Sequence, residues 1–545
     1  MIRTHGIDAR FSPGSNPRPH SRPASSILTR FSNRVAIPAA ASTHSPTTEM
    51  SEPVSLNEAP KTNFLQCGIS GVRHHASCGR SSIFTSKILI TPAPDLRCIQ
   101  QLSYAAILWF RDSDRSLPMT SPPGWLTSGW QWLRPYGRLA YYAVFPTRRP
   151  SYFRKPWTYP GSRLGASIRY LPDAAKPVYF FLPMCDWHSR MQRSQHMATA
   201  LAEHGAQAVY VNPHLGLEYA RPFCFDPHTR VARIAPGIFE LHVHLPREHE
   251  LHTRPLTCAE SARVTHELGR LIQAAGIRNA ALLVSFPAWI SSAEALSSRF
   301  GFPIVYDCHD WLPGFGRIAP ALLDQEADLF RLADLVVFSS PLLEQRAVDR
   351  HGPIRRTLLL RNAVQSFAAP AHQTSPSRPK TIGYIGALDH WLDIEAIAAV
   401  ARDHPGWRVI LAGRIEDRRV LQLETFSNVV FTGEIPYSAV PAQLENFDVA
   451  MIPFLLNDLT LATNPIKLYE YFSFGLPVVS SRLPEVEQYR NLVYIASTPG
   501  DFSSISAVAM REQDAGLREQ RIRTAREETW EVRARQLVHS IAALR

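Results

Sequence analysis

The sequence predicts an α/β protein with two doubly wound parallel sheets in series. Short apolar runs of strand length alternate with helical segments from Val178 onwards. A segment rich in Pro, Ser and Ala, 366–379, interrupts this alternation as a linker would, and the pattern restarts at Thr381. Strands that alternate with helices are typical of parallel doubly wound sheets. Two such domains face each other across a cleft, and ligands bind beyond the carboxyl ends of the strands.

The expected elements follow from apolar periodicity. In the first domain, 177–365, strands are expected at 178–184, 208–211, 281–286, 304–307, 335–339 and 357–360. Its helices are expected near 190–204, 258–275, 290–299 and 319–333. In the second domain, 380–520, strands are expected at 381–385, 409–412, 429–432, 449–453 and 478–480. Its helices are expected near 393–403, 416–424, 438–446 and 465–474. A helical region over 511–545, with a C-terminal helix at 521–545, is expected to pack back across the first domain.

Composition excludes several classes of function. The formal net charge of +11 is concentrated in residues 1–176, and the rest of the 545-residue chain has slightly more acidic than basic residues. A broad nucleic-acid surface is therefore not expected on the folded part. The seven cysteines have irregular spacing without a CxxC pair, which predicts neither a disulfide framework nor a zinc site. A reducing, cytoplasmic compartment is the expectation, and we find neither a secretory signal nor an apolar run of about 18–20 residues.

The N-terminal third differs from the rest. Residues 1–120 are rich in Ser, Pro, Arg and Thr without a sustained period, which predicts a largely disordered extension. An alternative is that residues 1–118 are not native protein, because Met50 and Met119 are alternative starts. In the connecting segment 121–176, aromatic and arginine side chains interleave over 122–160. This pattern suits a membrane surface, stacked bases, or an extension packed on the globular body.

The segment from Asn464 to Val479 carries most of the functional signal. Asn464 is expected to cap a helix, Pro465 to occupy its first position, and Gly475 to adopt the left-handed conformation after it. The N-terminus of such a helix attracts an anion, and Lys467 in the first turn would be favoured by a bound phosphate. Glu470 lies on the same face, where its carboxylate can accept hydrogen bonds from ribose hydroxyls. The alternative is a surface Lys–Glu pair at i,i+3.

This segment, NPIKLYEYFSFGLPVVSS, resembles the donor-binding segment of GT-B glycosyltransferases, particularly the retaining enzymes of glycosyltransferase family 4. TIGYIGALDHWLDIEAI and HPGWRVILAGRIED resemble the first two strands of the second domain with their loops. LLLRNAV resembles the end of the first domain, and IVYDCHDW and DWHSRMQRSQHMATALAEHG resemble two of its loops. The likeness covers about 177–545. It implies a GT-B fold of two Rossmann-like domains, an acceptor-side domain at 177–365 and a donor-binding domain at 380–520.

The resemblance also implies roles for individual residues. Those expected to act on the transferring sugar and the leaving diphosphate are His309, Lys467 and Arg414. Those expected to bind the donor are Glu470 at the ribose, Asn464 and Pro465 at the sugar, Asp389 and Trp391 at the nucleotide, and Asn362 near the hinge. Those expected in the acceptor-side loop are Asp186, Trp187 and Arg193. Asp186 and Arg193 have a second interpretation, in which they form a buried ion pair beneath that loop.

Three positions depart from the family pattern. Ala462 stands where the first of two glutamates is usual, so its contact with the donor sugar is missing or moved. Ala387 and Trp391 lie near the usual Arg and Lys of a phosphate clamp. Cys185-Asp186-Trp187 replaces a Gly-Gly turn.

The resemblance implies a hexosyltransferase that moves a sugar from a nucleotide-diphosphate donor to a glycan or lipid-linked acceptor, with retention, in surface polysaccharide biosynthesis. No Asp-x-Asp motif follows a strand, so neither a metal nor another cofactor is expected. The expected location is cytoplasmic, peripheral to the inner face of the plasma membrane. Two alternatives stay open: a nucleotide-sugar epimerase, and a catalytically degraded GT-B protein that acts as a binding or scaffold protein.

Overall fold

The structure is a computed structural model that describes residues 162–163, 171–188, 190–213, 229–245, 249, 251–365 and 378–544. All of these residues belong to one compact unit, Ile90–Arg545. The predicted extension 1–120, with its alternative starts, lies outside the described residues. So do the aromatic and arginine-rich stretch 122–160, most of the connecting segment 121–176, and residues 366–377 of the predicted linker.

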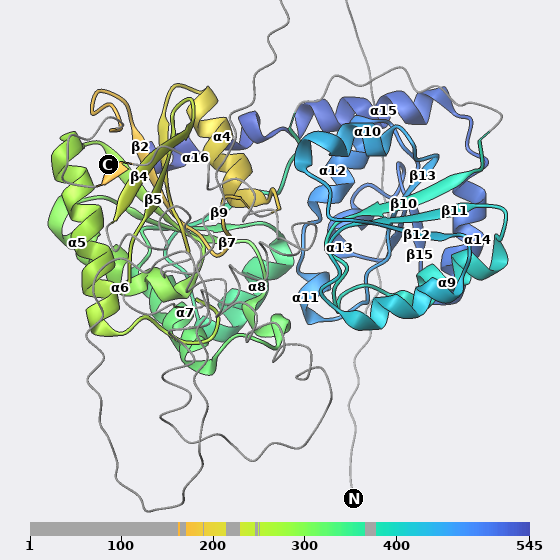
Figure 1. Ribbon diagram of the computed structural model, residues 1–545, viewed down its shortest axis with the longest axis horizontal. Coiled ribbons are helices and arrows are strands. Elements are labelled where there is room, and N and C mark those ends of the chain that lie inside the picture. The colour runs from red at the N-terminus through yellow and green to blue at the C-terminus, as the bar shows by residue number, and fades with distance from the viewer. Residues whose placement is uncertain are drawn as a thin grey trace, which may run out of the picture. The chain divides into compact units, whose positions relative to one another are not determined.

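Within the described residues, the first lobe is built on a nine-stranded sheet in the order β1-β4-β5-β3-β2-β6-β7-β8-β9 (Figure 1). Its strands are β1 Ser162–Arg163, β2 Val178–Leu182, β3 Gln207–Val211, β4 Arg230–Ala235, β5 Ile238–His242, β6 Ala280–Val284, β7 Ile304–Cys308, β8 Leu335–Phe338 and β9 Thr357–Leu359. Neighbours from β5 to β9 run parallel, which confirms the predicted doubly wound sheet. Strand β5 and the antiparallel strands β4 and β1, which follow it at one end of the sheet, were not among the predicted strands. Gly237 turns the chain tightly from β4 into β5 with a φ of +72°, which a side chain would resist.

Different helices cover the two faces of this sheet, because side chains alternate along each strand. Val178, Phe180 and Leu182 of β2 share one hydrophobic core with α5 (Cys258–Ala275), α6 (Ile290–Phe300), α7 (Pro320–Leu332) and α8 (Pro341–His351). Tyr179 and Phe181 pack on the opposite face, against α4 (Arg193–Glu203) and α16 (Trp530–Ala542). Two 3-10 helices, η4 Pro287–Trp289 and η5 Leu312–Phe315, follow β6 and β7.

Within the described residues, the second lobe has a six-stranded, wholly parallel sheet in the order β12-β11-β10-β13-β14-β15. Its strands are β10 Thr381–Ile385, β11 Arg408–Ala412, β12 Val429–Gly433, β13 Val449–Ile452, β14 Val478–Ser481 and β15 Tyr494–Ala496. Its helices are α9 Ile394–Asp403, α10 Val440–Leu444, α11 Asp458–Leu461, α12 Ile466–Ser473, α13 Pro484–Glu487 and α14 Pro499–Ala509.

Helices α11, α13 and α14 were not predicted, and two of the predicted helices of this lobe differ from prediction. The helix expected near 416–424 is a 3-10 helix, η6 Arg418–Thr425. Its buried Val420 and Leu423 are three residues apart, and a helix with three residues per turn places them on one side. The helix expected at 438–446 begins with a 3-10 turn, η7 Tyr437–Ala439, before α10.

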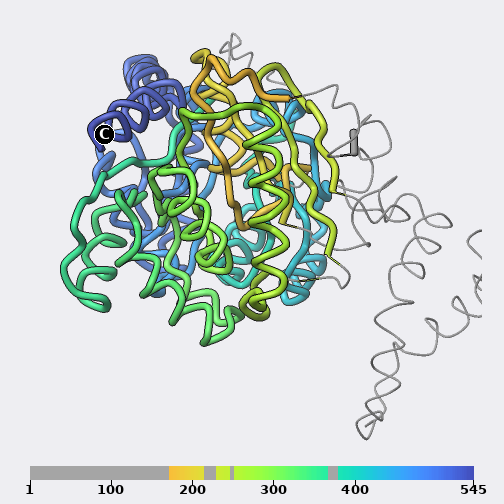
Figure 2. The backbone as a smooth tube through the Cα atoms, turned by 90° about the vertical axis from the view of Figure 1, so that its left-hand side faces the viewer, coloured from red at the N-terminus to blue at the C-terminus, as the bar shows by residue number. Residues whose placement is uncertain are grey.

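The C-terminal region is two helices rather than one. Helix α15 (Ala515–Glu527) packs on α12 of the second lobe, and α16 packs on α4 of the first (Figures 1 and 2). The break lies at Glu528, after which the Thr529 hydroxyl caps α16 by accepting from the Val532 amide. Trp530 then packs in the core of the first lobe. No helix in the described ranges combines the length and apolarity needed to cross a membrane.

Candidate functional site

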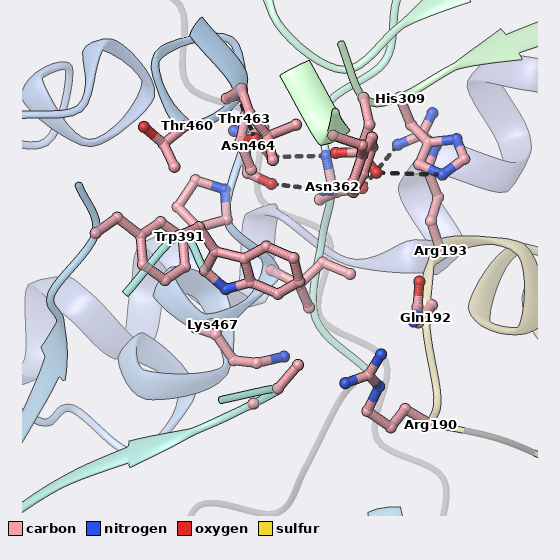
Figure 3. A pocket seen from close by; sticks show the side chains of 18 of the residues that line it. Arg190, Gln192, Arg193, His309, Asn362, Trp391, Thr460, Thr463, Asn464 and Lys467 are labelled. Atoms are coloured by element: carbon pink, nitrogen blue, oxygen red, sulfur yellow. Dashed lines mark hydrogen bonds and ion pairs between the residues drawn. The ribbon is translucent and has the colours of Figure 1, made fainter. Parts of the chain in front are cut away.

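A pocket of about 280 Å³ is lined by loops from both lobes (Figure 3). On the first lobe, Met184 follows β2 and His309 follows β7. On the second, Gly386 follows β10 and Phe454 follows β13. All four loops leave the carboxyl ends of parallel strands, which is where doubly wound sheets bind ligands.

Helix α12 begins at this pocket. Pro465 precedes the helix instead of starting it, with an extended conformation of φ −76° and ψ 116°. Asn464 does not cap α12, so the predicted cap was wrong by one residue. Gly475 has the predicted left-handed conformation, with a φ of +67°. Lys467 lines the pocket from the first turn, where the helix also presents amides and a partial positive charge.

The loop after β10 lies directly against Lys467. A Cβ atom added at Gly386 would come within 3.2 Å of Lys467 Cε and 2.5 Å of Tyr384 Oη. Gly386 therefore permits the close approach of this loop to α12. Lys467 Nζ lies 3.5 Å from Glu470 Oε2.

Glu470 does not line the pocket. Its side chain is only 3% exposed, so its contact with Lys467 is not the surface pair of the alternative interpretation. Burial and Glu470 together raise the pKa of the adjacent Tyr437. Seen from the pocket, Glu470 thus lies behind Lys467, on the side of α12 that faces Tyr437 of η7.

Asn464 joins the two lobes. Its Oδ1 accepts from the Asn362 amide at 2.8 Å, and its carbonyl accepts from Asn362 Nδ2 at 2.6 Å. Its own Nδ2 donates to Glu485 Oε2 at 2.7 Å and to Tyr469 Oη at 3.0 Å. Arg361 Nε donates to the same Glu485 oxygen at 2.8 Å. The Asn464 side chain, which the sequence pattern predicted to cap α12, instead bonds to Asn362, Glu485 and Tyr469.

Arg193 extends this hydrogen-bond network from Asn362 to Asp307, at the end of β7 in the first lobe. Its Nε lies 2.9 Å from Asp307 Oδ1, and its Nη1 donates to Asn362 Oδ1 at 2.9 Å. The predicted alternative of an Arg193–Asp186 ion pair is therefore wrong: the carboxylate that Arg193 meets lies at the end of β7. Arg193 is 2% exposed by residue and lines the pocket.

His309 stands beside this pair. Its Nδ1 lies 3.0 Å from the carbonyl oxygen of Asp307. A carbonyl can only accept, so Nδ1 carries the hydrogen in this contact. Nε2 lies 3.6 Å from Asp310 Oδ2. Burial raises the pKa of Asp310 above its ordinary value, and the nearby His309 and Arg193 offset only part of that rise.

The loop around Ala462 is docked on the first lobe. Ala462 is fully buried in the core of that lobe, and its carbonyl accepts from Ser340 Oγ at 2.6 Å. A Cβ atom at Gly314 would lie 2.8 Å from Leu459 Cβ, so the backbone of η5 approaches α11 closely. The position where resembling enzymes have a glutamate is here a contact between lobes.

The structure thus brings together seven of the predicted site residues around one pocket: His309, Lys467, Asn464, Pro465, Trp391, Asn362 and Arg193. The others lie outside its lining. Arg414 pairs with Glu416, with 3.2 Å between Nε and Oε1, and its side chain is 47% exposed. Asp389 accepts from Arg317 at 3.1 Å. Trp187 packs edge-on against Tyr210, 5.1 Å between ring centres, and Asp186 is buried in the same loop.

Sequence reasoning missed several residues of the site. Arg190 and Gln192 line the pocket just before α4, and Asp307 and Glu485 hold its polar network. Asp307 lies inside the IVYDCHDW motif, which was a usable signal. Arg190 and Gln192 lie inside the DWHSRMQRSQHMATALAEHG motif, which was a signal of the same kind, whereas nothing local distinguished Glu485. The described residues contain no cluster of three or more His, Cys, Asp or Glu side chains placed to hold a metal ion.

Residues 379–507 match the family described as glycosyl transferases group 1. A protein of Bacillus subtilis (strain 168), named a putative teichuronic acid biosynthesis glycosyltransferase, TuaH, is 25% identical over 270 residues, which cover 45% of this chain and 68% of that protein. The chain is a glycosyltransferase of the GT-B type.

The solved structure of a sucrose-phosphate synthase agrees with the fold of this glycosyltransferase. Sucrose-phosphate synthase from Thermosynechococcus elongatus has a TM-score of 0.53 and 14% identity, over 68% of this chain and 99% of that one. Anabaena Alr3699/HepE in complex with UDP and glucose has a TM-score of 0.48 and 15% identity, over 67% of this chain and 99% of that one. At 14% identity, the likeness to sucrose-phosphate synthase supports the fold alone. The assignment to family 4 in particular stays a prediction.

Proposed function

We propose that this glycosyltransferase transfers a sugar from a nucleotide-diphosphate donor to a glycan or lipid-linked acceptor, with retention of the anomeric configuration. The observation that carries the proposal is Lys467, which lines the pocket from the first turn of α12. A cation and a helix N-terminus at one place favour a diphosphate strongly. The name of the Bacillus subtilis relative supports surface polysaccharide biosynthesis as the setting.

The proposed reaction needs the charge of the departing diphosphate to be stabilised and the acceptor hydroxyl to be aligned. The bond from the anomeric carbon to the phosphate oxygen breaks, and a bond from that carbon to the acceptor oxygen forms. The departing phosphate oxygen takes the proton of the acceptor. Lys467 and the helix N-terminus stabilise the diphosphate, so the proposal requires neither a metal nor another cofactor.

The remaining pocket residues position the donor. His309 lies beside the transferring sugar, and backbone groups of Asn464 and Pro465 line it. Trp391 offers an apolar wall to the nucleotide. We assign Asp389 and Arg414 to the outer part of the same donor site, and the loop with Asp186 and Trp187 to the acceptor side. The reaction is proposed to take place in the cytoplasm, at the inner face of the plasma membrane.

Ligand-induced stabilisation of the full chain tests the donor class. Thermal unfolding is measured with UDP, GDP, ADP and their sugars, because a ligand that binds the native state raises Tm by mass action. We expect one nucleoside diphosphate and its sugars to raise Tm. If none of them does, the proposal is wrong. Turnover of the stabilising sugar nucleotide is then followed with and without a glycan acceptor, and epimerisation without acceptor would also overturn it.

A binding protein without turnover is the second candidate. Ala462 favours it, because a neutral, buried side chain stands where resembling enzymes place a glutamate. This candidate predicts that a sugar nucleotide raises Tm without being consumed in the presence of any acceptor.

The role of Glu470 can be tested separately with Glu470→Gln, which keeps the shape of the side chain and removes its charge. If Glu470 holds the ribose, affinity for the nucleoside diphosphate falls about tenfold or more and affinity for pyrophosphate is unchanged. Equal losses for both ligands would instead assign Glu470 to the positioning of Lys467, 3.5 Å away. Glu424→Gln, at an exposed site, is the control.

A further inference from the structure

Arg190 is a cation of the first lobe that lines the same pocket as Lys467 of the second. It lies in the loop between β2 and α4, three residues before the helix begins. Figure 3 shows its guanidinium group on the side of the pocket facing the ammonium group of Lys467. The two charges therefore approach one volume from different lobes.

The cations that line the described part of this pocket differ in how firmly they are paired. Arg193 Nε lies 2.9 Å from an oxygen of Asp307, within hydrogen-bond distance. Lys467 Nζ lies 3.5 Å from Glu470 Oε2. Arg190 Nη1 lies 3.8 Å from Glu416 Oε1, beyond hydrogen-bond distance, and no hydrogen-bond partner is placed at this atom among the described residues. Arg190 is thus the least neutralised of the three.

The second lobe offers little else to a diphosphate. The loop after β10 places Ala387 and Trp391 at the pocket, and neither carries a charge. Arg414 is directed to Glu416 and lies outside the lining. Among the described residues that line the pocket, Lys467 is therefore the cation from the second lobe. One ammonium group cannot neutralise the charge of two phosphate groups.

We infer that Arg190 binds the diphosphate of the donor together with Lys467, so that each lobe supplies one cation. This inference rests on the proposed function. A guanidinium group suits the task because its planar array of donors can bind two phosphate oxygens at once. Glu416, on the second lobe, is the carboxylate that Arg190 leaves when the diphosphate binds. Donor binding is thereby coupled to the contact between the lobes.

Calorimetric binding to the full chain tests the inference, with UDP, GDP and ADP and with the nucleoside of whichever binds. In Arg190→Ala, we expect affinity for the nucleoside diphosphate to fall about 10- to 100-fold, the effect of losing a charged hydrogen-bonding partner. Affinity for the nucleoside is expected to stay unchanged. Arg190→Lys should recover part of the loss, and Glu416→Gln should tighten diphosphate binding by freeing Arg190. Arg331→Ala, on the exposed side of α7, is the matched control and should bind as the wild type does.

The outcomes separate this inference from the proposed function. If Arg190→Ala binds the diphosphate within about twofold of the wild type while Lys467→Ala does not bind it, Arg190 has no such role and the proposed function stands. If the wild type binds no nucleoside diphosphate, the proposed function falls and the inference with it. Should Arg190→Ala not fold, Arg190→Lys and Glu416→Gln decide: unchanged diphosphate affinity in both would overturn the inference.

Discussion

Asn362 and Asn464 lie on different lobes and are joined by two hydrogen bonds, one to the side chain and one to the main chain of Asn464. Asn464 is 1% exposed and also holds Glu485 and Tyr469. In Asn464→Ala the buried partners lose these bonds, and we expect the free energy of unfolding to fall by about 2–4 kcal/mol. Denaturant unfolding at equilibrium measures this.

The control for this prediction is Asn446→Ala. Asn446 is exposed, and its side-chain Nδ2 donates to the Ala442 carbonyl at 2.8 Å. Its loss should cost less than about 1 kcal/mol. Equal effects of the two substitutions would show that Asn464 does not hold the lobes together.

Arg193 and Asp307 form a buried ion pair. The loss of stability on removing this pair should depend on whether one partner or both are replaced. Their side chains are 3% and 15% exposed. Arg193→Met leaves the Asp307 carboxylate without its cation, and we expect a loss of about 3–5 kcal/mol in unfolding free energy. Asp307→Leu should cost a similar amount. The double variant should be more stable than the sum of the two losses predicts, which a double-mutant cycle measures. Additive losses would contradict the pairing.

Much of the second lobe could be predicted from local pattern, because its helices begin and end at residues with intrinsic preferences. Gly475 after α12 is such a residue, and the strand 381–385 was predicted to the residue. Asn464 shows where local pattern fails. An Asn before Pro is a good cap, but its partners Asn362 and Glu485 lie 102 and 21 residues away and are not visible from periodicity. For the same reason, the pairing of Arg193 with Asp307, 114 residues away, could not be predicted from periodicity.

The edge of the first sheet was missed for another reason. Strand β4 carries the charged residues Arg230 and Arg233 and lies between β1 and β5, antiparallel to both. These charged residues interrupt the apolar run that marks an inner strand, so periodicity does not reveal β4. The inner strands of the same sheet, such as β6 and β7, are almost wholly buried and were found.

Ala462 offers a test of whether the missing family glutamate can be restored. The side chain is fully buried in the first lobe, and the Ala462 carbonyl accepts from Ser340. Ala462→Glu would bury a charge at a packed contact, so we expect a loss of several kcal/mol in stability. We also expect no gain in sugar transfer. Thermal unfolding and turnover check the two parts.

The control at this position is Ala462→Gly, which keeps the carbonyl and removes only a methyl group, and it should cost about 1 kcal/mol. Wild-type stability together with faster transfer in Ala462→Glu would show that the position still faces the donor.

The free energy of unfolding should depend on pH through the ionisation of Glu326, which lies on α7. Burial raises its pKa from 4.5 to about 7, while Tyr306, whose hydroxyl donates to Oε1 at 2.7 Å, lowers it. Between these two pH values the folded chain holds a proton that the unfolded chain has released. The contribution of Glu326 to stability is therefore complete below about pH 4.5 and declines as pH rises to about 7. Above that pH it changes no further.

Glu326→Gln removes the titrating group and keeps an acceptor for Tyr306. The decline in unfolding free energy between about pH 5 and about pH 8 should therefore be smaller in this variant than in the wild type. Denaturant unfolding across that range, with Glu424→Gln as the exposed control, measures the difference. Parallel curves for the Glu326 variant and the wild type would mean that Glu326 ionises normally in the folded chain.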